Sequence, residues 1–494
     1  MKWNPPKFKL LGIWFMNDLS KLTEINTRDK LLEVKHLFKT WSKRMCTPLG
    51  RVAVLKSLIL SKLIYLWILL PNPPDKDIKQ LQKLCFEFVW DQKTDKIRRK
   101  YSVQNVENGG IGIPNIEKFI QSLKMTWIRK IYFTTSKWKT LLVMNCPNIN
   151  SLETYGPRRL INSKCNKFWN DVFLAYIHFS EKIIPKQSEE ITAEPLFFND
   201  KFKIGRKPFY FKKWAEKNIL LVKDVLDDKG QFLNHTSFSQ KYDLQVNYLD
   251  YLGCIQAIKS YISINNVHIK DGKYNQRTKT LQIISDVKKG SRIYYDILLE
   301  KMLVYDISTF VKWEQKLNII VHWENTLKQV RKIKEVKLKW FQLRLCHNIL
   351  VTNCILKKMG ISERDMCTFC ENEKDSVQHY LWYCTFSQCF WTQLENVLKD
   401  KCEQCQRVKF NIELVLFGND DVTKTDDQFD HIILLAKYFL YKNKIKKTKP
   451  EIKNFLHELK LQYETEKYMY SLEMKYTEFC RQWYPYEKLL ETDV

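Results

Sequence analysis

The sequence has no apolar run long enough to cross a membrane. The longest run, Leu58 to Leu70, spans ~13 residues, includes Ser61 and Lys62 and stops at Pro71, whereas a spanning helix needs about 20 residues. A secretory signal is also missing, because Met1 is followed by a lysine, a tryptophan and two prolines instead of an apolar segment. We therefore expect a protein that is neither secreted nor inserted in a membrane.

Acidic residues are too few to balance the basic ones. The 494 residues include 82 Lys+Arg against 55 Asp+Glu, which gives a net charge of +27. Apolar residues make up 45% and aromatic residues 14%, too many for a disordered chain. We find no long amphipathic helix with its lysines confined to one face, so nucleic acid is a better candidate polyanion than a lipid surface.

The chain contains fourteen cysteines, but nothing in its sequence directs it to an oxidising compartment. Thiols stay reduced in the cytosol and the nucleus. We therefore predict reduced cysteines and a cytoplasmic or nuclear protein.

Helical periodicity dominates, and we predict a mainly α fold. Thr47 and Pro48 are typical of a helix start, and an apolar stripe follows as far as Leu70. A second helix is predicted to begin near Asp75. The glycines from Gly109 to Gly112 predict a turn, because the third glycine of a dinucleotide-binding loop is missing.

The second half of the chain also shows helix signals. A helix is predicted from about residue 331, then a short helix capped at Thr352 and ended by Gly360. Another helix carries Phe390 and Trp391. The tail, from about 427, is predicted to hold two helices separated by the lysine-rich run 442–449 and by Pro450. We divide the chain into residues 1–145, 146–330, 331–400 and 401–494, with a mixed, less regular pattern in the second region.

Four residues of metal-ligand type lie close together in the third region. Cys367 and Cys370 have two residues between them, and His379 and Cys384 follow. Thiolate and imidazole at such spacing favour a tetrahedral zinc site in a small knuckle, with no open position for catalysis. The alternative is buried thiols beside a surface histidine. Phe369, Leu381 and Trp382 are predicted to form an apolar shell around the ligands.

A second cysteine pair, Cys402 and Cys405, has the same spacing. A second metal there would have to share Cys384 with the first, which needs a metal cluster. We therefore expect spare thiols at these two positions.

Catalytic groups are not evident. Two-metal polymerase or nuclease chemistry needs converging carboxylates, and the sequence has three adjacent pairs, at 227–228, 420–421 and 426–427. Each pair stands in polar, turn-like sequence with no aromatic residue two positions before it. We predict solvated carboxylates and no enzymatic activity for the chain as it stands.

Aromatic residues alternate with basic ones in two stretches, from Trp127 to Lys139 and from Phe202 to Trp214. Flat rings between cations can stack on unpaired bases. The rings can equally be core residues, with the lysines on the solvent-facing side of the same segments. The sequence leaves both interpretations open.

Several segments resemble the part of LINE-type (non-LTR) retrotransposon reverse transcriptases that follows the catalytic palm. The matching residues are Phe8 to Ile13, Trp41, Pro48 to Val52, Lys56, Lys62 to Tyr65, Phe88 to Trp90, Gly109 to Pro114, Asp224 to Leu226, Gly230 to Phe232, Lys241 with Tyr242, Trp313 with Glu314, Trp323, His347 to Leu350, Thr352 with Asn353, the Cys-Cys-His-Cys cluster, and Phe390 with Trp391.

The resemblance implies a helical thumb-like region, a connector, a reverse-transcriptase zinc-binding domain and a helical basic tail. It also implies RNA, DNA or an RNA–DNA hybrid as partner and structural zinc as cofactor. Independently of the resemblance, we expect that the helical tail can bind another protein. The family's endonuclease and its aromatic-x-Asp-Asp palm hairpin are not in the sequence. The expected nucleic-acid contacts are Arg51, Lys56, Lys93, Lys96, Arg98, Arg99 and Lys100.

Two other interpretations remain. One is a host-retained scaffold whose zinc knuckle and tail bind proteins. The other is a segment of a longer RNA-directed DNA polymerase. Salt dependence separates nucleic-acid binding from an apolar protein interface, because only phosphate contacts weaken steeply with salt.

Overall fold

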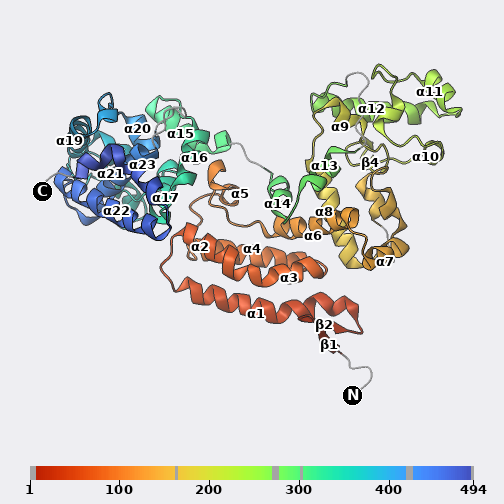
Figure 1. Cartoon of the computed structure of the whole chain (residues 1–494), viewed down its shortest axis with the longest axis horizontal. Coiled ribbons are helices and arrows are strands. Elements are labelled where there is room, and N and C mark those ends of the chain that lie inside the picture. Colours follow the sequence, from red (N-terminus) through yellow and green to blue (C-terminus); the bar gives the residue numbers. More distant parts are fainter. Residues whose placement is uncertain (1–6, 162–164, 270–276, 301–303, 419–426, 491–494) are drawn as a thin grey trace. The chain divides into compact units, whose positions relative to one another are not determined.

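The computed structural model describes residues 7–161, 165–269, 277–300, 304–418 and 427–490 (Figure 1). Helices account for 65% and strands for 4% of the structure. The predicted mainly α fold is confirmed.

The chain forms two compact units that alternate along the sequence. Unit 1 comprises Met1–Lys43, Leu55–Cys85 and Pro114–Lys301, and unit 2 comprises Arg44–Val54, Phe86–Ile113 and Met302–Val494. The four sequence regions rest on resemblance and periodicity, and that division stays a prediction.

Unit 1 is built from helices and two short antiparallel hairpins. Its strands are β1 (Lys7–Leu10), β2 (Ile13–Met16), β3 (Lys203–Ile204) and β4 (Lys207–Pro208). Its α-helices are α1 (Leu22–Ser42), α3 (Ser61–Leu69), most of α4 (Asp75–Val89), α6 (Ile116–Phe133), α7 (Lys137–Asn145), α8 (Lys167–Lys182), α9 (Ser188–Thr192), α10 (Lys212–Glu216), α11 (His235–Tyr242), α12 (Tyr248–Ile264), α13 (Lys279–Asp286) and α14 (Arg292–Leu298).

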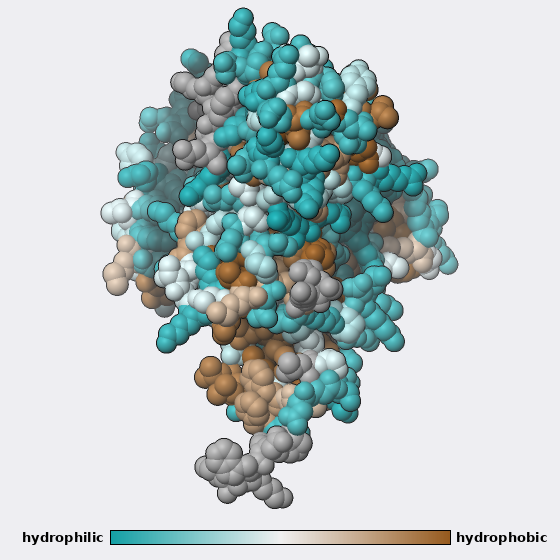
Figure 2. Space-filling model, turned by 90° about the vertical axis from the view of Figure 1, so that its right-hand side faces the viewer, coloured by the Kyte–Doolittle hydropathy of each residue, from teal (hydrophilic) through white to brown (hydrophobic). Residues whose placement is uncertain are grey.

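The β1–β2 hairpin exposes apolar side chains. Phe8 pairs with Phe15 across the two strands, yet Phe8, Leu10 and Leu11 are 51%, 55% and 83% exposed. Hydrophobic residues gather at the lower end of Figure 2, the end at which β1 lies in Figure 1. An exposed edge strand of this kind can pair with a further strand.

The single helix predicted from Pro48 to Leu70 is interrupted. α2 (Pro48–Val54) runs into a π-helical turn over Leu55–Ile59, and α3 follows after Leu60. Thr47 Oγ1 accepts a hydrogen bond from Gly50 N at 3.1 Å, so the predicted cap is confirmed. Among the described residues no single helix is long and apolar enough to cross a membrane; by length and composition alone the pair Pro48–Ile59 and Ser61–Leu69, bent by 49°, passes that test.

The aromatic-basic stretches supply core rings. Trp127 packs edge-on against Trp138 and Trp169 at 5.6 Å between ring centroids. These three rings are half-buried, whereas Phe202 and Trp214 are buried in a second cluster of unit 1. Phe133 and Tyr210, by contrast, are 52% and 43% exposed, so the two stretches contain both core rings and rings that solvent can reach.

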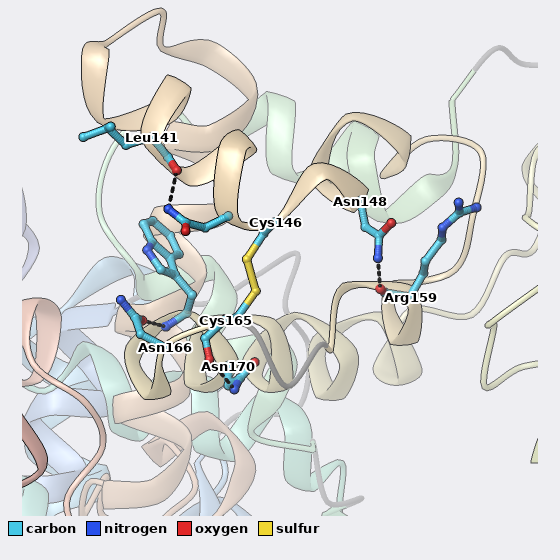
Figure 3. The surroundings of a disulfide bond; sticks show 9 residues. Leu141, Cys146, Asn148, Arg159, Cys165, Asn166 and Asn170 are labelled. Carbon is cyan, nitrogen blue, oxygen red and sulfur yellow. Dashed lines mark hydrogen bonds between the residues drawn. A yellow bond between two sulfur atoms is a disulfide. The ribbon is translucent and has the colours of Figure 1, made fainter.

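One disulfide corrects the prediction that all cysteines are reduced. Cys146 follows α7, Cys165 precedes α8, and the two are joined (Figure 3). Asn148 Nδ2 donates to Arg159 O at 3.0 Å across the same loop. The cysteines are 19 positions apart, and they meet with a Cα–Cα distance of 6.3 Å because the segments that carry them share one core.

Unit 2 contains the C-terminal helices, which pack against one another (Figure 1). Its α-helices are α2, the end of α4, α5 (Arg99–Ser102), α15 (Ser308–Leu317), α16 (Trp323–Lys332), α17 (Val336–Cys346), α18 (Asn353–Lys358), α19 (Thr385–Lys401), α20 (Ile412–Phe417), α21 (Asp427–Lys446), α22 (Ile452–Leu472) and α23 (Tyr476–Trp483). The predicted cap at Thr352 is confirmed, since its side chain accepts from Ile355 N. The lysine-rich run 442–449 was predicted to separate two helices, but α21 includes residues 442–446 of it. The break between α21 and α22 therefore covers only residues 447–451.

Residues that carry the family resemblance meet in the core of unit 2. His347 Nε2 lies 2.8 Å from the carbonyl oxygen of Gly109. Phe310 stacks on Trp323 at 4.1 Å, and Trp323 Nε1 donates to Glu314 Oε1 at 3.2 Å. Positions more than 200 residues apart in sequence thus form one packed cluster, so these motifs build the fold.

The glycine turn belongs to this cluster. Gly109 has a φ of +75°, and a Cβ at Gly110 would clash with backbone carbonyl oxygens of Gln104 and Tyr101. Only glycine fits this close approach of two backbone segments. The turn that the sequence predicts is therefore confirmed.

Candidate metal centre

The four predicted metal ligands converge in unit 2. One ligand atom from each of Cys367, Cys370, His379 and Cys384 lies within 4.8 Å of the others. Cys367 Sγ is 3.9 Å from Cys384 Sγ, and Cys370 Sγ is 3.3 Å from His379 Nε2. Cys367, His379 and Cys384 are buried and Cys370 is half-buried.

Three local structures present these ligands. Cys367 and Cys370 lie on a tight loop closed by hydrogen bonds from Cys367 N to Glu373 O (2.7 Å) and from Glu371 N to Cys367 O (3.0 Å). His379 begins a π-helical turn that ends at Tyr383. Cys384 is the N-cap residue of α19. The short loops of the sequence spacing therefore form a compact knuckle.

The surroundings favour thiolate at Cys384. The hydrogen bond from Cys367 and the amide N–H groups of Phe386 and Ser387 lower the pKa of Cys384. The amino-terminal end of α19 adds a favourable dipole for negative charge. A thiolate at this position is the form that binds a metal ion.

A carboxylate stands behind the histidine ligand. Glu373 Oε2 lies 3.1 Å from His379 Nδ1, on the ring nitrogen opposite the cysteine side. His379 Nδ1 makes no hydrogen bond within the described residues, so this carboxylate lies beside the imidazole without fixing its orientation. Of the predicted apolar shell, Phe369 and Leu381 are buried and Trp382 is half-buried.

Asn353 stabilises the loop that carries Cys367 and Cys370, and nothing in the sequence predicted this role. Its side-chain Nδ2 donates to Met366 O at 2.7 Å and to Thr368 Oγ1 at 3.2 Å. Its backbone N–H donates to the carboxylate of Asp375. The start of α18 therefore fixes both sides of the loop that carries Cys367.

A buried ion pair joins the knuckle to α21. Asp375 is fully buried, and its Oδ2 lies 2.8 Å from Lys444 Nζ. Lys444 also donates to Val351 O at 3.2 Å, and its ammonium lies 5.2 Å from the ring centre of Tyr380. In the sequence, Lys444 is recognisable only as one residue of the lysine-rich run 442–449.

The donor set fits a structural metal ion. Three sulfur atoms and one imidazole nitrogen complete a tetrahedral shell, which leaves no position for water or substrate. The mostly buried ligands and their supports suit a centre that stabilises the fold. The cluster can therefore hold a metal without carrying out hydrolysis.

The other cysteine pair lies elsewhere. Cys402 and Cys405 are buried beyond the far end of α19. Among the described residues they belong to no group of three or more potential metal ligands.

The predicted nucleic-acid contacts divide into buried and exposed residues. Arg51 is buried, and its guanidinium donates to Phe88 O and Asp91 Oδ1, both at 2.8 Å. This removes Arg51 from the candidate phosphate contacts, because its donors already hold unit 2 together. Lys56 is exposed and belongs to unit 1.

The basic loop is solvent-exposed in unit 2. The exposed side chains are those of Lys93, Lys96, Arg98, Arg99 and Lys100. Arg99 forms an ion pair with Asp95 at 2.6 Å and lies 4.7 Å from the ring of Phe86. Lys93 pairs with Asp91 at 3.2 Å. Phosphate binding by these residues stays a prediction.

One of the adjacent carboxylate pairs takes part in a turn. Asp227 Oδ1 accepts from the backbone N–H groups of Lys229 and Gln231, so it stabilises a turn that contains Gly230. The pair 420–421 and residue 426 lie outside the described residues.

Protonation of His347 is expected to destabilise the protein in mild acid. Burial lowers the pKa of His347 from 6.5 to about 4, so below pH 6.5 the unfolded chain binds more protons than the folded one. Stability is then lost as the pH falls from 6.5 to 4, by roughly 3 kcal/mol. His347→Gln keeps a donor for Gly109 and should reduce this pH dependence in urea unfolding. An unchanged pH profile in the variant would contradict a neutral, buried imidazole.

No protein-family model matches the sequence.

Proposed function

We propose that this chain binds nucleic acid and corresponds to the part of a LINE-type reverse transcriptase that follows the palm. The convergence of Cys367, Cys370, His379 and Cys384 carries the proposal, because those residues belong to the segment that resembles the family's zinc-binding domain. The clustering of other resembling residues, such as Gly109 and His347, supports it. The chain would hold an RNA–DNA hybrid or its strands, and it would act in the cytoplasm or the nucleus.

Zinc is the metal proposed for the Cys3His cluster. Thiolate and imidazole ligands favour zinc over magnesium or calcium, which prefer oxygen. In this role the ion would order the knuckle and the start of α19. We expect no polymerisation, because among the described residues the one group of three or more potential metal ligands is the Cys3His cluster, which contains no carboxylate.

A segment of a longer polymerase is the second candidate. The β1–β2 hairpin and its turn, with Phe8, Leu10 and Leu11 in solvent, favour it, because a neighbouring domain would bury these apolar side chains. Sequencing the transcript upstream of the Met1 codon tests this candidate. Coding sequence with an aromatic-x-Asp-Asp motif would support it, and an in-frame stop codon directly before Met1 would exclude it.

Binding of a labelled RNA–DNA hybrid by the full chain tests the proposed function. The chain carries a net charge of +27, and each phosphate contact contributes ~0.9 to the slope of log K against log salt. We expect binding that weakens steeply with potassium chloride in fluorescence anisotropy, and no primer extension. Absent binding, or binding insensitive to salt, would favour the protein scaffold instead.

A further inference from the structure

One end of the basic loop lies against α17. The rings of Trp90 and Trp340 are 6.1 Å apart, and the guanidinium of Arg344 lies 6.0 Å from the ring centre of Trp340. Arg344 also donates from Nη1 to the hydroxyl of Tyr441 at 3.3 Å. Lys93 N donates to Trp90 O at 3.0 Å, so the contact of Trp90 with α17 brings Arg344 to the start of the basic loop, although about 250 residues separate them in the sequence.

Two buried donors in this region lack a partner. Within the described part of the chain, Trp90 Nε1 and Arg344 Nε are buried and make no hydrogen bond. Trp90 is only 4% exposed. A buried donor without an acceptor costs free energy, so an acceptor from a ligand would be favourable here.

The charges around these donors are crowded. Desolvation, then the charges of Arg344 and Lys93, lower the pKa of Lys96. The nearest loop carboxylates already have partners, since Asp91 pairs with Arg51 and Lys93, and Asp95 pairs with Arg99. Cations held together in this way repel one another until an anion joins them.

We propose that Lys96 and Arg344, with Lys93 at the rim, form a binding site for a phosphodiester group of the nucleic-acid backbone. This inference rests on the proposed function. A guanidinium and an ammonium suit phosphate oxygens. Trp90 and Trp340 are buried, so the site offers no ring for a base to stack on. The contact would therefore be independent of sequence.

Salt titrations of the full chain with a labelled RNA–DNA hybrid test this site. Lys96→Gln with Arg344→Gln should lower the slope of log K against log salt by ~2 units, and Lys96→Gln alone by ~1 unit. The matched control is Lys453→Gln with Lys460→Gln, which removes two exposed charges from α22 of the same unit and should leave the slope unchanged. The single variant at exposed Lys96 keeps the test valid even where the double variant fails to fold.

The results of these titrations distinguish failure of this binding site from failure of the proposed function. Steep binding by the parent chain with an unchanged slope in the Lys96→Gln variant would overturn this site and leave the proposed function intact. Absent binding by the parent chain would overturn both. Millimolar inorganic phosphate should compete no better than potassium chloride of equal ionic strength. Specific displacement of the hybrid by phosphate in the parent, but not in the variant, would show a site for free phosphate and overturn the backbone assignment.

Discussion

Replacing Cys370 with serine is expected to abolish metal binding and unfold the knuckle locally. The variant loses one of four ligands, and metal-binding free energy in such sites is folding free energy. Hydrogen exchange should show lost amide protection from Cys367 to Cys384, because the loop hydrogen bonds and the π-helical turn depend on the ion. Unit 1 should keep its protection, since it contains none of the ligands.

The control for this experiment is Cys389→Ser. Cys389 is exposed on α19, and the substitution makes the same chemical change outside the cluster. It should retain one metal ion and unaltered protection. Retention of the metal by the Cys370→Ser variant, with normal protection of the loop, would show that Cys370 is not a ligand.

Replacing Lys444 with methionine should destabilise unit 2 by about 3–5 kcal/mol, because it leaves the carboxylate of Asp375 buried without its ion-pair partner. Methionine keeps most of the side-chain volume, so the loss measured in guanidinium unfolding reports the charge. The double variant Asp375→Asn with Lys444→Met removes both charges and should lose less than the single variant.

Lys446→Met provides the control two residues along the same helix. Lys446 is exposed, and its replacement should change stability by less than about 0.5 kcal/mol. Equal stability of the Lys444→Met and Lys446→Met variants would contradict the structural role of the ion pair.

Local signals explain what could be predicted from the sequence. The cap at Thr352, the turn at Gly109 to Gly112 and the ligand spacing from Cys367 to Cys384 all depend on residues that are close in sequence. Side-chain chemistry and spacing define such features directly. The fold class followed in the same way, from helical periodicity.

Contacts between distant segments could not be predicted in this way. The family resemblance predicted that Arg51 contacts a phosphate group, but in the structure Arg51 is buried and donates hydrogen bonds to Phe88 and Asp91. Lys444 stood in a basic run typical of solvent, yet the packing of α21 on the knuckle pairs it with Asp375. The Cys146–Cys165 disulfide likewise depends on how α7 and α8 share one core.

X-ray absorption at the zinc edge of the purified full chain tests whether the Cys-Cys-His-Cys cluster is a structural zinc centre. We expect one zinc ion per chain with three sulfur neighbours at about 2.3 Å and one nitrogen neighbour at about 2.0 Å. Protein without zinc, or zinc surrounded only by oxygen and nitrogen, would contradict it.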